Sequence, residues 1–179
     1  MSVVENTKTL APAGTWAADP VHSNVSFEVA YAGVNTFRGS FSDFTATLEG
    51  DSLAGSAKVG SVDVKDEQLS GHLQAPDFFD AERYPELAFV SKSIERSGDE
   101  LTIKGDVTIR GHTEPVELTA TITEPIADPY GGTRFGLKLE TTIDRLAFGI
   151  SWNNPLPSGE PALSNDVVLS ADLQLSRQA

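Results

Sequence analysis

The segment 101–122, which reads LTIKGDVTIRGHTEPVELTATI, constrains the fold more than any other part of the chain. Apolar and polar residues alternate in it on both sides of a turn, with Leu101, Ile103, Val107 and Ile109 before the turn and Val116, Leu118, Ala120 and Ile122 after it. Successive side chains of a strand point to opposite faces, so each half has one apolar face. We therefore predict a long antiparallel hairpin that turns at 111–115 and buries one face.

The same alternation recurs along most of the chain. It predicts further strands at 25–31, 37–41, 44–48, 57–64, 87–91, 135–143 and 167–175. The alternation changes phase between Phe41 and Phe44, which indicates a bulge. Two segments break the pattern: Leu69 and Leu73 are four residues apart, which predicts a short helix within 65–73, and 75–85 sets three aromatic residues between two prolines, which favours a compact helical turn.

So many antiparallel strands leave unpaired edges in a flat sheet, whereas closure into a barrel removes the edges. We expect an all-β fold: a single eight-stranded antiparallel lipocalin-like barrel with a short helix and a helical turn between strands. The barrel domain is predicted to span residues 15–179, after a flexible N-terminal leader at residues 1–14 that is polar and contains Pro12 and Gly14.

Composition and the N-terminal sequence argue against several partners and against secretion. The formal net charge of -13 argues against nucleic acid and anionic membrane surfaces as partners. There is no cysteine, which excludes disulfides, thiolate metal sites and cysteine nucleophiles. No apolar run approaches the roughly 18 residues that span a bilayer, so we expect no membrane span. The first residues lack the basic and apolar regions of a secretory signal, which predicts a cytoplasmic protein.

Five motifs, in this order, resemble the YceI-like family, the lipocalin-like polyisoprenoid-binding proteins, over residues 16–175. They are WAADPVHS at 16–23 leading to Val25-Ser26-Phe27; RGSF at 38–41; His72-Leu73 with DFFD at 77–80 and Tyr84-Pro85; GDVTIRG at 105–111 with Pro115-Val116; and RLAFG at 145–149. Two positions depart from the pattern: Tyr31 stands where many relatives have histidine, and Ser70-Gly71 where an Arg-Asp pair is common.

The resemblance implies an eight-stranded barrel, often a homodimer, whose elongated apolar channel holds a long polyprenyl chain such as that of a polyprenyl pyrophosphate or a polyprenyl quinone. On this basis we expect a non-catalytic protein that sequesters, stores or transports a polyisoprenoid lipid and needs no cofactor. At about 0.8 kcal/mol per buried methylene, roughly twenty such groups gross ~16 kcal/mol, so burial alone suits this ligand.

The candidate ligand-binding residues are apolar side chains expected to face the channel. They are Phe27, Val29, Phe41, Phe44, Phe78, Phe79, Phe89, Ile109, Leu118, Phe135, Leu137, Leu139, Ile143 and Phe148. Candidates for a headgroup or mouth position are His22, Tyr31, Arg145 and Trp152. Alternation alone leaves two questions open. Inward glycines such as Gly39 and Gly105 either leave a hollow or house neighbouring phenylalanines, and Arg145 either anchors a headgroup or clamps backbone carbonyls near Trp152.

Two other classes of function remain as alternatives. One is a hydrolytic or metal-assisted enzyme that uses His22, His72 or Asp77, and the other is a stress or interaction protein with a filled barrel. The histidines match no metal-ligand spacing, and His22, Ser23 and Asp19 lie too close in sequence for the geometry of a triad. We therefore predict neither a catalytic site nor a metal site.

Overall fold

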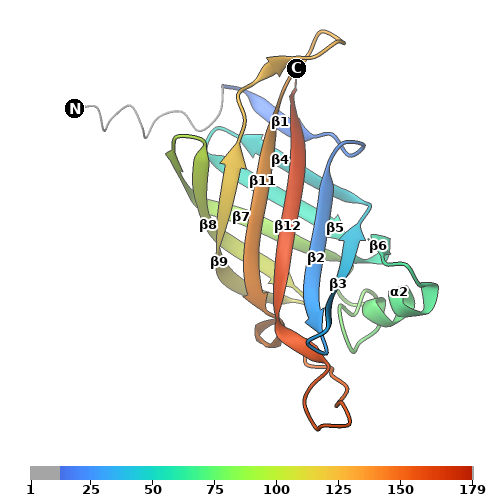
Figure 1. Cartoon of the computed structure of the whole chain (residues 1–179). Helices are drawn as coiled ribbons and strands as arrows, with labels where there is room; N and C mark the ends of the chain where they lie inside the picture. The colour runs from blue at the N-terminus through green and yellow to red at the C-terminus, as the bar shows by residue number, and fades with distance from the viewer. Residues whose placement is uncertain (1–12, 179) are drawn as a thin grey trace.

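Antiparallel strands close into a barrel in the computed structural model, which describes residues 13–178 (Figure 1). Around the barrel the ladder runs β11-β9-β8-β7-β5-β4-β1-β12, and β12 pairs back onto β11, which closes the eight positions. The strands are β1 (Thr15–Ala18), β2 (Asn24–Tyr31), β3 (Asn35–Phe41), β4 (Phe44–Glu49), β5 (Ser52–Lys58), β6 (Val62–Asp63), β7 (Glu86–Ser97), β8 (Glu100–Ile109), β9 (His112–Ile122), β10 (Ile126–Ala127), β11 (Thr133–Asp144) and β12 (Leu163–Arg177). This confirms the predicted fold class. Most of the predicted leader, residues 1–12, lies outside the described residues.

Some barrel positions are built from two short strands in succession. Both β1 and β2 pair with β12: β1 pairs with residues 175–177 at its end, and β2 pairs with it between 163 and 172. The strand β3 pairs with β2, and β4 pairs with β1. The predicted bulge between Phe41 and Phe44 is a break at Ser42 and Asp43, where the chain passes from its ladder with β2 to its ladder with β1. The phase change in the sequence therefore marks a change of partner.

The hairpin that dominates the sequence is formed by β8 and β9, in register from Glu100 opposite Thr121 to Ile109 opposite His112. Its turn is only Arg110 and Gly111, with φ of 53° and 74°, so the predicted turn at 111–115 is too long. Pro115 belongs to β9 instead. A proline is tolerated there because the other side of β9 pairs with β11 only over 119–122 and needs no N–H at residue 115.

A short helix and a run of turns lie beside the lower part of the barrel, to the right in Figure 1. Helix α2 (Glu67–Gln74) begins after Asp66, whose carboxylate accepts the N–H groups of Gln68 (2.8 Å) and Leu69 (3.5 Å). The helical turn predicted at 75–85 is tied back to the helix, since Phe79 donates its N–H to the Leu73 carbonyl (2.9 Å). Within residues 13–178, no helix has the length and apolar composition needed to cross a bilayer.

The upper half of the barrel is a filled core. Trp16, Leu137 and Leu175 have almost no exposed surface, and the Trp16 ring packs edge-on against Phe135 with 4.7 Å between centroids. A second apolar cluster occupies the lower half and includes Phe27, Phe41 and Ile109. Two short 3-10 helices, η1 (Val59–Ser61) and η2 (Arg145–Phe148), border the lower cluster.

The inward glycines house aromatic rings. A Cβ built on Gly39 lies 2.5 Å from Cζ of Phe27, and one built on Gly105 lies 2.7 Å from Cζ of Phe89 and overlaps the Val90 carbonyl oxygen. Of the two readings that the sequence left open, these glycines follow the second: they make room for phenylalanine rings. Any hollow must arise elsewhere in the barrel.

Gly105→Ala is expected to destabilise the protein by about 2 kcal/mol, because the added methyl meets a backbone oxygen and a ring inside a packed wall. Gly71→Ala is the matched control. Gly71 lies in α2 with no heavy atom within 4 Å of an added Cβ, so alanine should stabilise by about 0.5–1 kcal/mol. Urea unfolding measures both, and equal effects of the two substitutions would refute this account of the interior glycines.

The loop before β11 at the upper end is organised by Asp128. Its carboxylate accepts the N–H groups of Gly132 and Tyr130, both at 2.8 Å, and the guanidinium of Arg134 at 2.9 Å. These contacts, the backbone donors first, hold the pKa of the Asp128 carboxyl below its usual value of 3.8.

The lowered pKa makes the contribution of Asp128 to stability dependent on pH. A depressed folded-state pKa stabilises the fold above the unfolded value of 3.8, and this stabilisation is lost as the pH falls through the folded value. Asp128→Asn should therefore lower the melting temperature at pH 7, and the gap to the parent protein should shrink in acid. Thermal melts at pH 7 and at about pH 3 measure it; a gap that widens in acid would contradict the assignment.

Candidate functional site

The lower half of the barrel encloses a cavity of about 510 Å³. This volume falls within the range of about 300–1,000 Å³ that is typical of small-molecule sites. Its wall is almost entirely apolar and comes from β2, β3, α2 and the turns after it, the facing ends of β7 and β8, β11, η2 with the loop that follows it, and β12. The lining residues are Phe27, Val29, Tyr31, Asn35, Phe37, Phe41, Leu69, His72, Leu73, Phe78, Phe79, Leu87, Ile109, Ile143, Arg145, Ile150, Trp152, Leu163, Val167 and Leu169.

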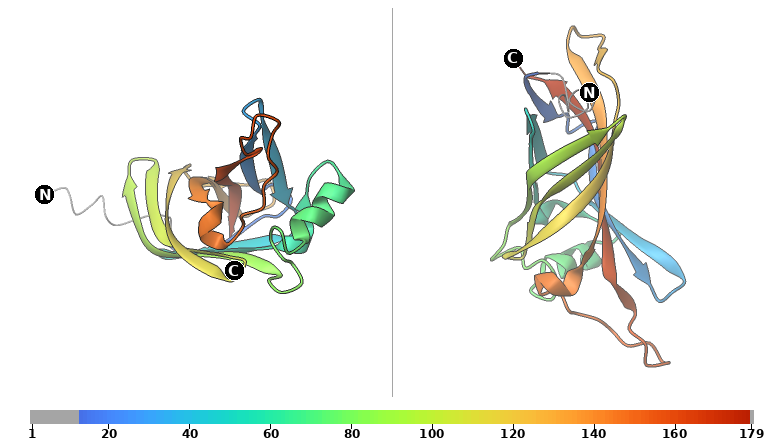
Figure 2. Two further views of the ribbon diagram at one scale, coloured as in Figure 1. Left: turned by 90° about the horizontal axis from the view of Figure 1, so that it is seen from below. Right: turned by 90° about the vertical axis from the view of Figure 1, so that its left-hand side faces the viewer.

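The cavity lies where the barrel wall is not made of strands alone. The strand β6 pairs with β3 only at Ser40 and Phe41, so the rest of β3 has no strand partner on that side. Below it, α2 and the turns at 75–85 complete the wall with Leu69, Leu73 and Phe79. A helix and turns stand farther from the barrel axis than a ladder-paired strand does, as the view from below in Figure 2 shows. The space between them and β2 is the hollow.

A group of phenylalanines lines the inner part of the cavity. The Phe27 ring lies 5.8 Å from Phe41, 6.1 Å from Phe37 and 6.2 Å from Phe79, measured between centroids. These four rings make four contacts with one another, and three of the contacts are edge-to-face, which is a favoured arrangement of aromatic rings. The rings present a continuous apolar surface with no hydrogen-bonding group.

A second aromatic group sits near the mouth. The His72 ring packs edge-on against Phe78 (4.9 Å) and Trp152 (5.0 Å), and its Nε2 is 3.1 Å from Oδ2 of Asp77. His72 therefore has a polar partner outside the cavity and apolar neighbours inside it. In this position the histidine and Trp152 form part of the wall.

Arg145 holds one end of the cavity together. Its side chain is buried, with 4% exposed; Nε donates to the Ser164 carbonyl (2.9 Å), and Nη1 donates to the carbonyls of Ile150 (2.9 Å) and Trp152 (2.8 Å). Burial lowers the pKa of the guanidinium below its usual value, and the nearby Asp144 carboxylate partly offsets this. The arginine thus makes the backbone clamp near Trp152 that the sequence offered as one of two roles.

A smaller hollow of about 140 Å³ continues the cavity toward the filled end. The two hollows share Phe41, Leu87 and Leu169 in their linings. Together they trace an elongated path that begins at the lower end of the barrel and stops beneath the core around Trp16. This shape suits a slender ligand better than a round one.

The structure separates the candidate ligand residues into groups. Phe27, Val29, Tyr31, Phe41, Phe78, Phe79, Ile109, Ile143, Arg145 and Trp152 line the larger cavity, and Phe89, Leu118 and Leu139 line the smaller one. Others lie elsewhere. Phe135 and Leu137 belong to the filled core, Phe44 is half-buried between the two clusters, Phe148 is buried in the lower cluster, and His22 lies at the far end of the barrel.

Several lining residues are absent from the candidates chosen on sequence. Val167 and Leu169 alternate inward on β12, so the same period-two pattern that selected Ile143 could have found them. Leu69 and Leu73 share one face of α2, which their spacing of four already indicated. Arg110 braces the same end, because its guanidinium donates to the carbonyls of Gly149 and Pro76. No local sequence signal marks that role.

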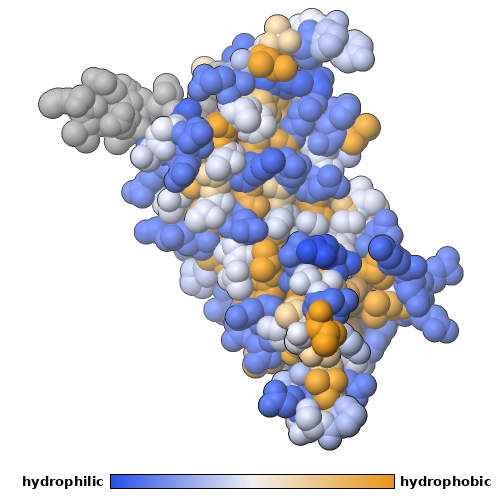
Figure 3. All heavy atoms as spheres, in the orientation of Figure 1, coloured by the Kyte–Doolittle hydropathy of each residue, from blue (hydrophilic) through white to orange (hydrophobic). Residues whose placement is uncertain are grey.

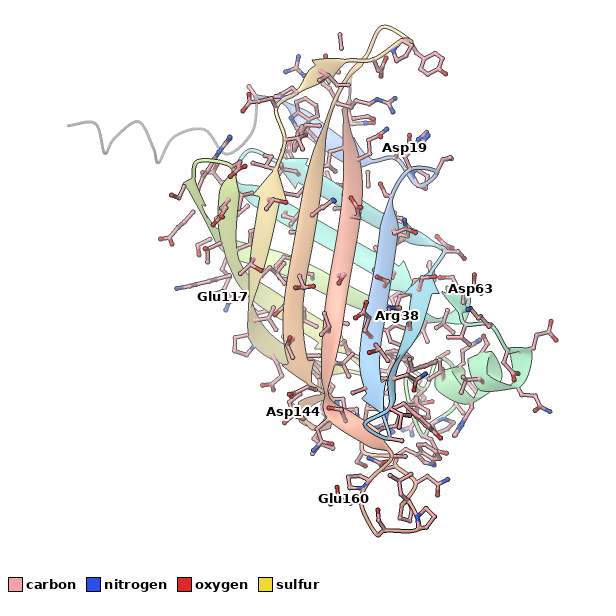
Figure 4. The ribbon with its side chains drawn as sticks, viewed as in Figure 1. Asp19, Arg38, Asp63, Glu117, Asp144 and Glu160 are labelled. Carbon is pink, nitrogen blue, oxygen red and sulfur yellow. The ribbon has the colours of Figure 1, made fainter. Side chains whose placement is uncertain are left out.

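The residues of the enzyme alternative lie at opposite ends of the barrel. His22 Nδ1 is 2.9 Å from Oδ2 of Asp19 at the upper end, where Figure 4 labels Asp19. The hydrogen bonds that the Asp19 carboxylate makes with His22 and with the Val21 N–H hold the pKa of this carboxyl below its usual range. His72 and Asp77 lie at the lower end. Among residues 13–178, no three His, Asp or Glu side chains gather as a metal site would require.

Comparison with known proteins identifies the family to which this barrel belongs. The family model described as a YceI-like domain matches residues 16–175. Protein YceI of Escherichia coli O157:H7 is 36% identical over 136 residues, which are 72% of this chain and 71% of that protein. Among solved structures, Burkholderia cenocepacia BcnA has a TM-score of 0.76 at 22% identity and covers 90% of this chain and 99% of its own. A polyisoprenoid binding domain from Saccharophagus degradans, implicated in plant cell wall breakdown, has a TM-score of 0.72 at 9% identity over 91% of this chain and 98% of its own. The chain belongs to the YceI-like family.

Proposed function

We propose that this protein binds a long-chain polyisoprenoid lipid in the barrel and sequesters, stores or transports it without catalysis. The observation that carries the proposal is the elongated apolar cavity, about 510 Å³ with a 140 Å³ extension, inside a YceI-like barrel. The solved fold neighbour from Saccharophagus degradans, described as a polyisoprenoid binding domain, supports the choice of ligand class. A prenyl chain is slender and apolar, so it gains affinity from burial alone.

The charges around the cavity favour a neutral headgroup, such as a quinone, over a pyrophosphate. Among the described lining residues, Arg145 is the only one with a permanent positive charge. Its Nε and Nη1 bind backbone carbonyls, which leaves Nη2 as the one nitrogen of this guanidinium without a partner. The chain also carries a formal net charge of -13, which disfavours an anionic ligand. A pyrophosphate needs several free cationic or N–H donors at the site.

Mass spectrometry of an organic extract of the purified protein tests the proposal. It should find a polyprenyl lipid, and added tetraprenyl benzoquinone should bind more tightly than geranylgeranyl pyrophosphate, which has a prenyl chain of equal length. Trp152 in the wall reports binding by its fluorescence. Extracts without a prenyl lipid, together with no binding of either compound, would refute the proposal.

A further inference from the structure

Two neighbouring loops at the lower end of the barrel carry almost no charge. These tip loops are residues 31–35 and 153–162, and Glu160 is their single charged residue, although charged residues make up 22% of the chain. They are joined by a hydrogen bond from the Ala32 N–H to the Ala162 carbonyl (2.6 Å) and by the pairing of Tyr31 with Leu163. Figures 1 and 2 show both loops beyond the closed part of the barrel, and Figure 4 labels Glu160 there.

The tip exposes apolar side chains next to the cavity. Val34 is 79% exposed and Tyr31 is 46% exposed, and Leu69 of α2 is also exposed at the same end. Figure 3 shows orange apolar surface among hydrophilic atoms at the lower end of the molecule. Single exposed apolar residues are normal, but a group of them around the mouth of a cavity marks an interaction surface. Since Tyr31 also lines the cavity, the exposed surface continues directly into the hollow.

The longer tip loop satisfies its backbone internally. The N–H of Leu156 donates to the Glu160 carbonyl (2.7 Å), and that of Ala162 donates to the Asn154 carbonyl (3.0 Å). Three more of its residues are prolines, which have no N–H to leave unpaired. A loop with few unpaired backbone donors loses little when it leaves water, which is the requirement for entering a lipid interface.

We propose that the tip loops dock on the surface of an electrically neutral lipid bilayer, so that the ligand passes between bilayer and cavity through the mouth. The purpose of this docking rests on the proposed function, because a bilayer is where a polyprenyl lipid is dissolved. Neutral lipid fits the tip, which has one charge, and the net charge of -13 on the chain disfavours an anionic surface. Tyrosine is a side chain that suits the boundary between headgroups and water.

The test compares two exposed valines at opposite ends of the barrel. Val34→Glu places a charge in the tip, and Val21→Glu is the matched control: Val21 is 82% exposed and lies beside Asp19 at the upper end. Tetraprenyl benzoquinone is loaded into phosphatidylcholine vesicles, and its transfer to the full-length protein is followed by the fluorescence of Trp152. Transfer to Val34→Glu should be about tenfold slower than to the parent protein, with Val21→Glu unchanged.

Further measurements separate the outcomes. The affinity for the quinone in detergent micelles should be the same in all three proteins, and transfer to the parent protein should slow when phosphatidylglycerol replaces part of the phosphatidylcholine. Equal transfer rates for Val34→Glu and the parent would overturn the docking proposal. So would a dimeric parent protein that Val34→Glu turns into a monomer without slowing transfer. If none of the three proteins binds quinone in detergent, the proposed function fails. Vesicle flotation of the same three proteins then still tests docking. Loss of flotation in Val34→Glu alone supports the docking proposal, and equal flotation of all three refutes it.

Discussion

Replacing Arg145 by methionine is expected to destabilise the protein by about 4 kcal/mol. The substitution removes three charge-assisted hydrogen bonds, to the carbonyls of Ser164, Ile150 and Trp152, while keeping much of the apolar volume of the side chain. Each carbonyl left buried without a donor costs about 1–3 kcal/mol, and relaxation of the loop recovers part of the total. Because Ile150 and Trp152 line the cavity, the same change should also weaken ligand binding.

Urea unfolding measures this effect against two other substitutions. Arg38→Met removes an arginine that is 67% exposed and paired with Glu28 at 3.0 Å, so it should cost no more than about 1 kcal/mol. Arg145→Lys keeps the charge without the planar fork of donors and should fall between the two. A loss for Arg145→Met no greater than that for Arg38→Met would show that the clamp contributes little.

Filling the cavity from β12 is expected to reduce affinity for tetraprenyl benzoquinone by about 100-fold. Val167 lines the larger cavity between Val29 and Ile143, its partners on the neighbouring strands. The indole of Val167→Trp would take the place of several ligand methylenes, each worth about 0.8 kcal/mol. The stability of the protein should change little, because the ring enters space that already exists.

The adjacent residue provides the control. Val168 follows on the same strand and, by alternation, points away from the barrel interior toward the side of Glu28 and Thr142. Val168→Trp should keep the affinity of the parent protein within about twofold. Fluorescence titration in detergent micelles measures both, with circular dichroism as the check that each variant folds. Similar losses in the two variants would argue against a binding site inside the barrel.

The barrel could be predicted from the sequence because strand alternation is a local property. The segment 101–122 forms the long hairpin of β8 and β9, and the short helix and the turns at 75–85 occur where the alternation stops. The length of the hairpin turn could not be predicted, because Pro115 suggested a loop although the missing N–H faces the side of β9 where the ladder with β11 is short. Proline excludes a strand only where both sides of the strand are paired.

The hollow could not be predicted from the same pattern. Phe27 and Phe135 are both inward-facing on alternating strands, yet one lines the cavity and the other packs against Trp16. The difference is set by what lies across the barrel, which period two does not encode. On the sequence, Gly39 and Gly105 fitted either a hollow or room for neighbouring phenylalanines, and the structure shows the second. The cavity opens instead where α2 completes the wall.

The most direct test of lipid binding is a crystal structure of the protein after incubation with tetraprenyl benzoquinone. We predict continuous elongated density that begins near Trp152, passes between Phe27 and Phe79, and continues past Phe41 toward the smaller hollow. A barrel whose lower half is closed by its own side chains, or holds only ordered water after this incubation, would contradict the proposed function.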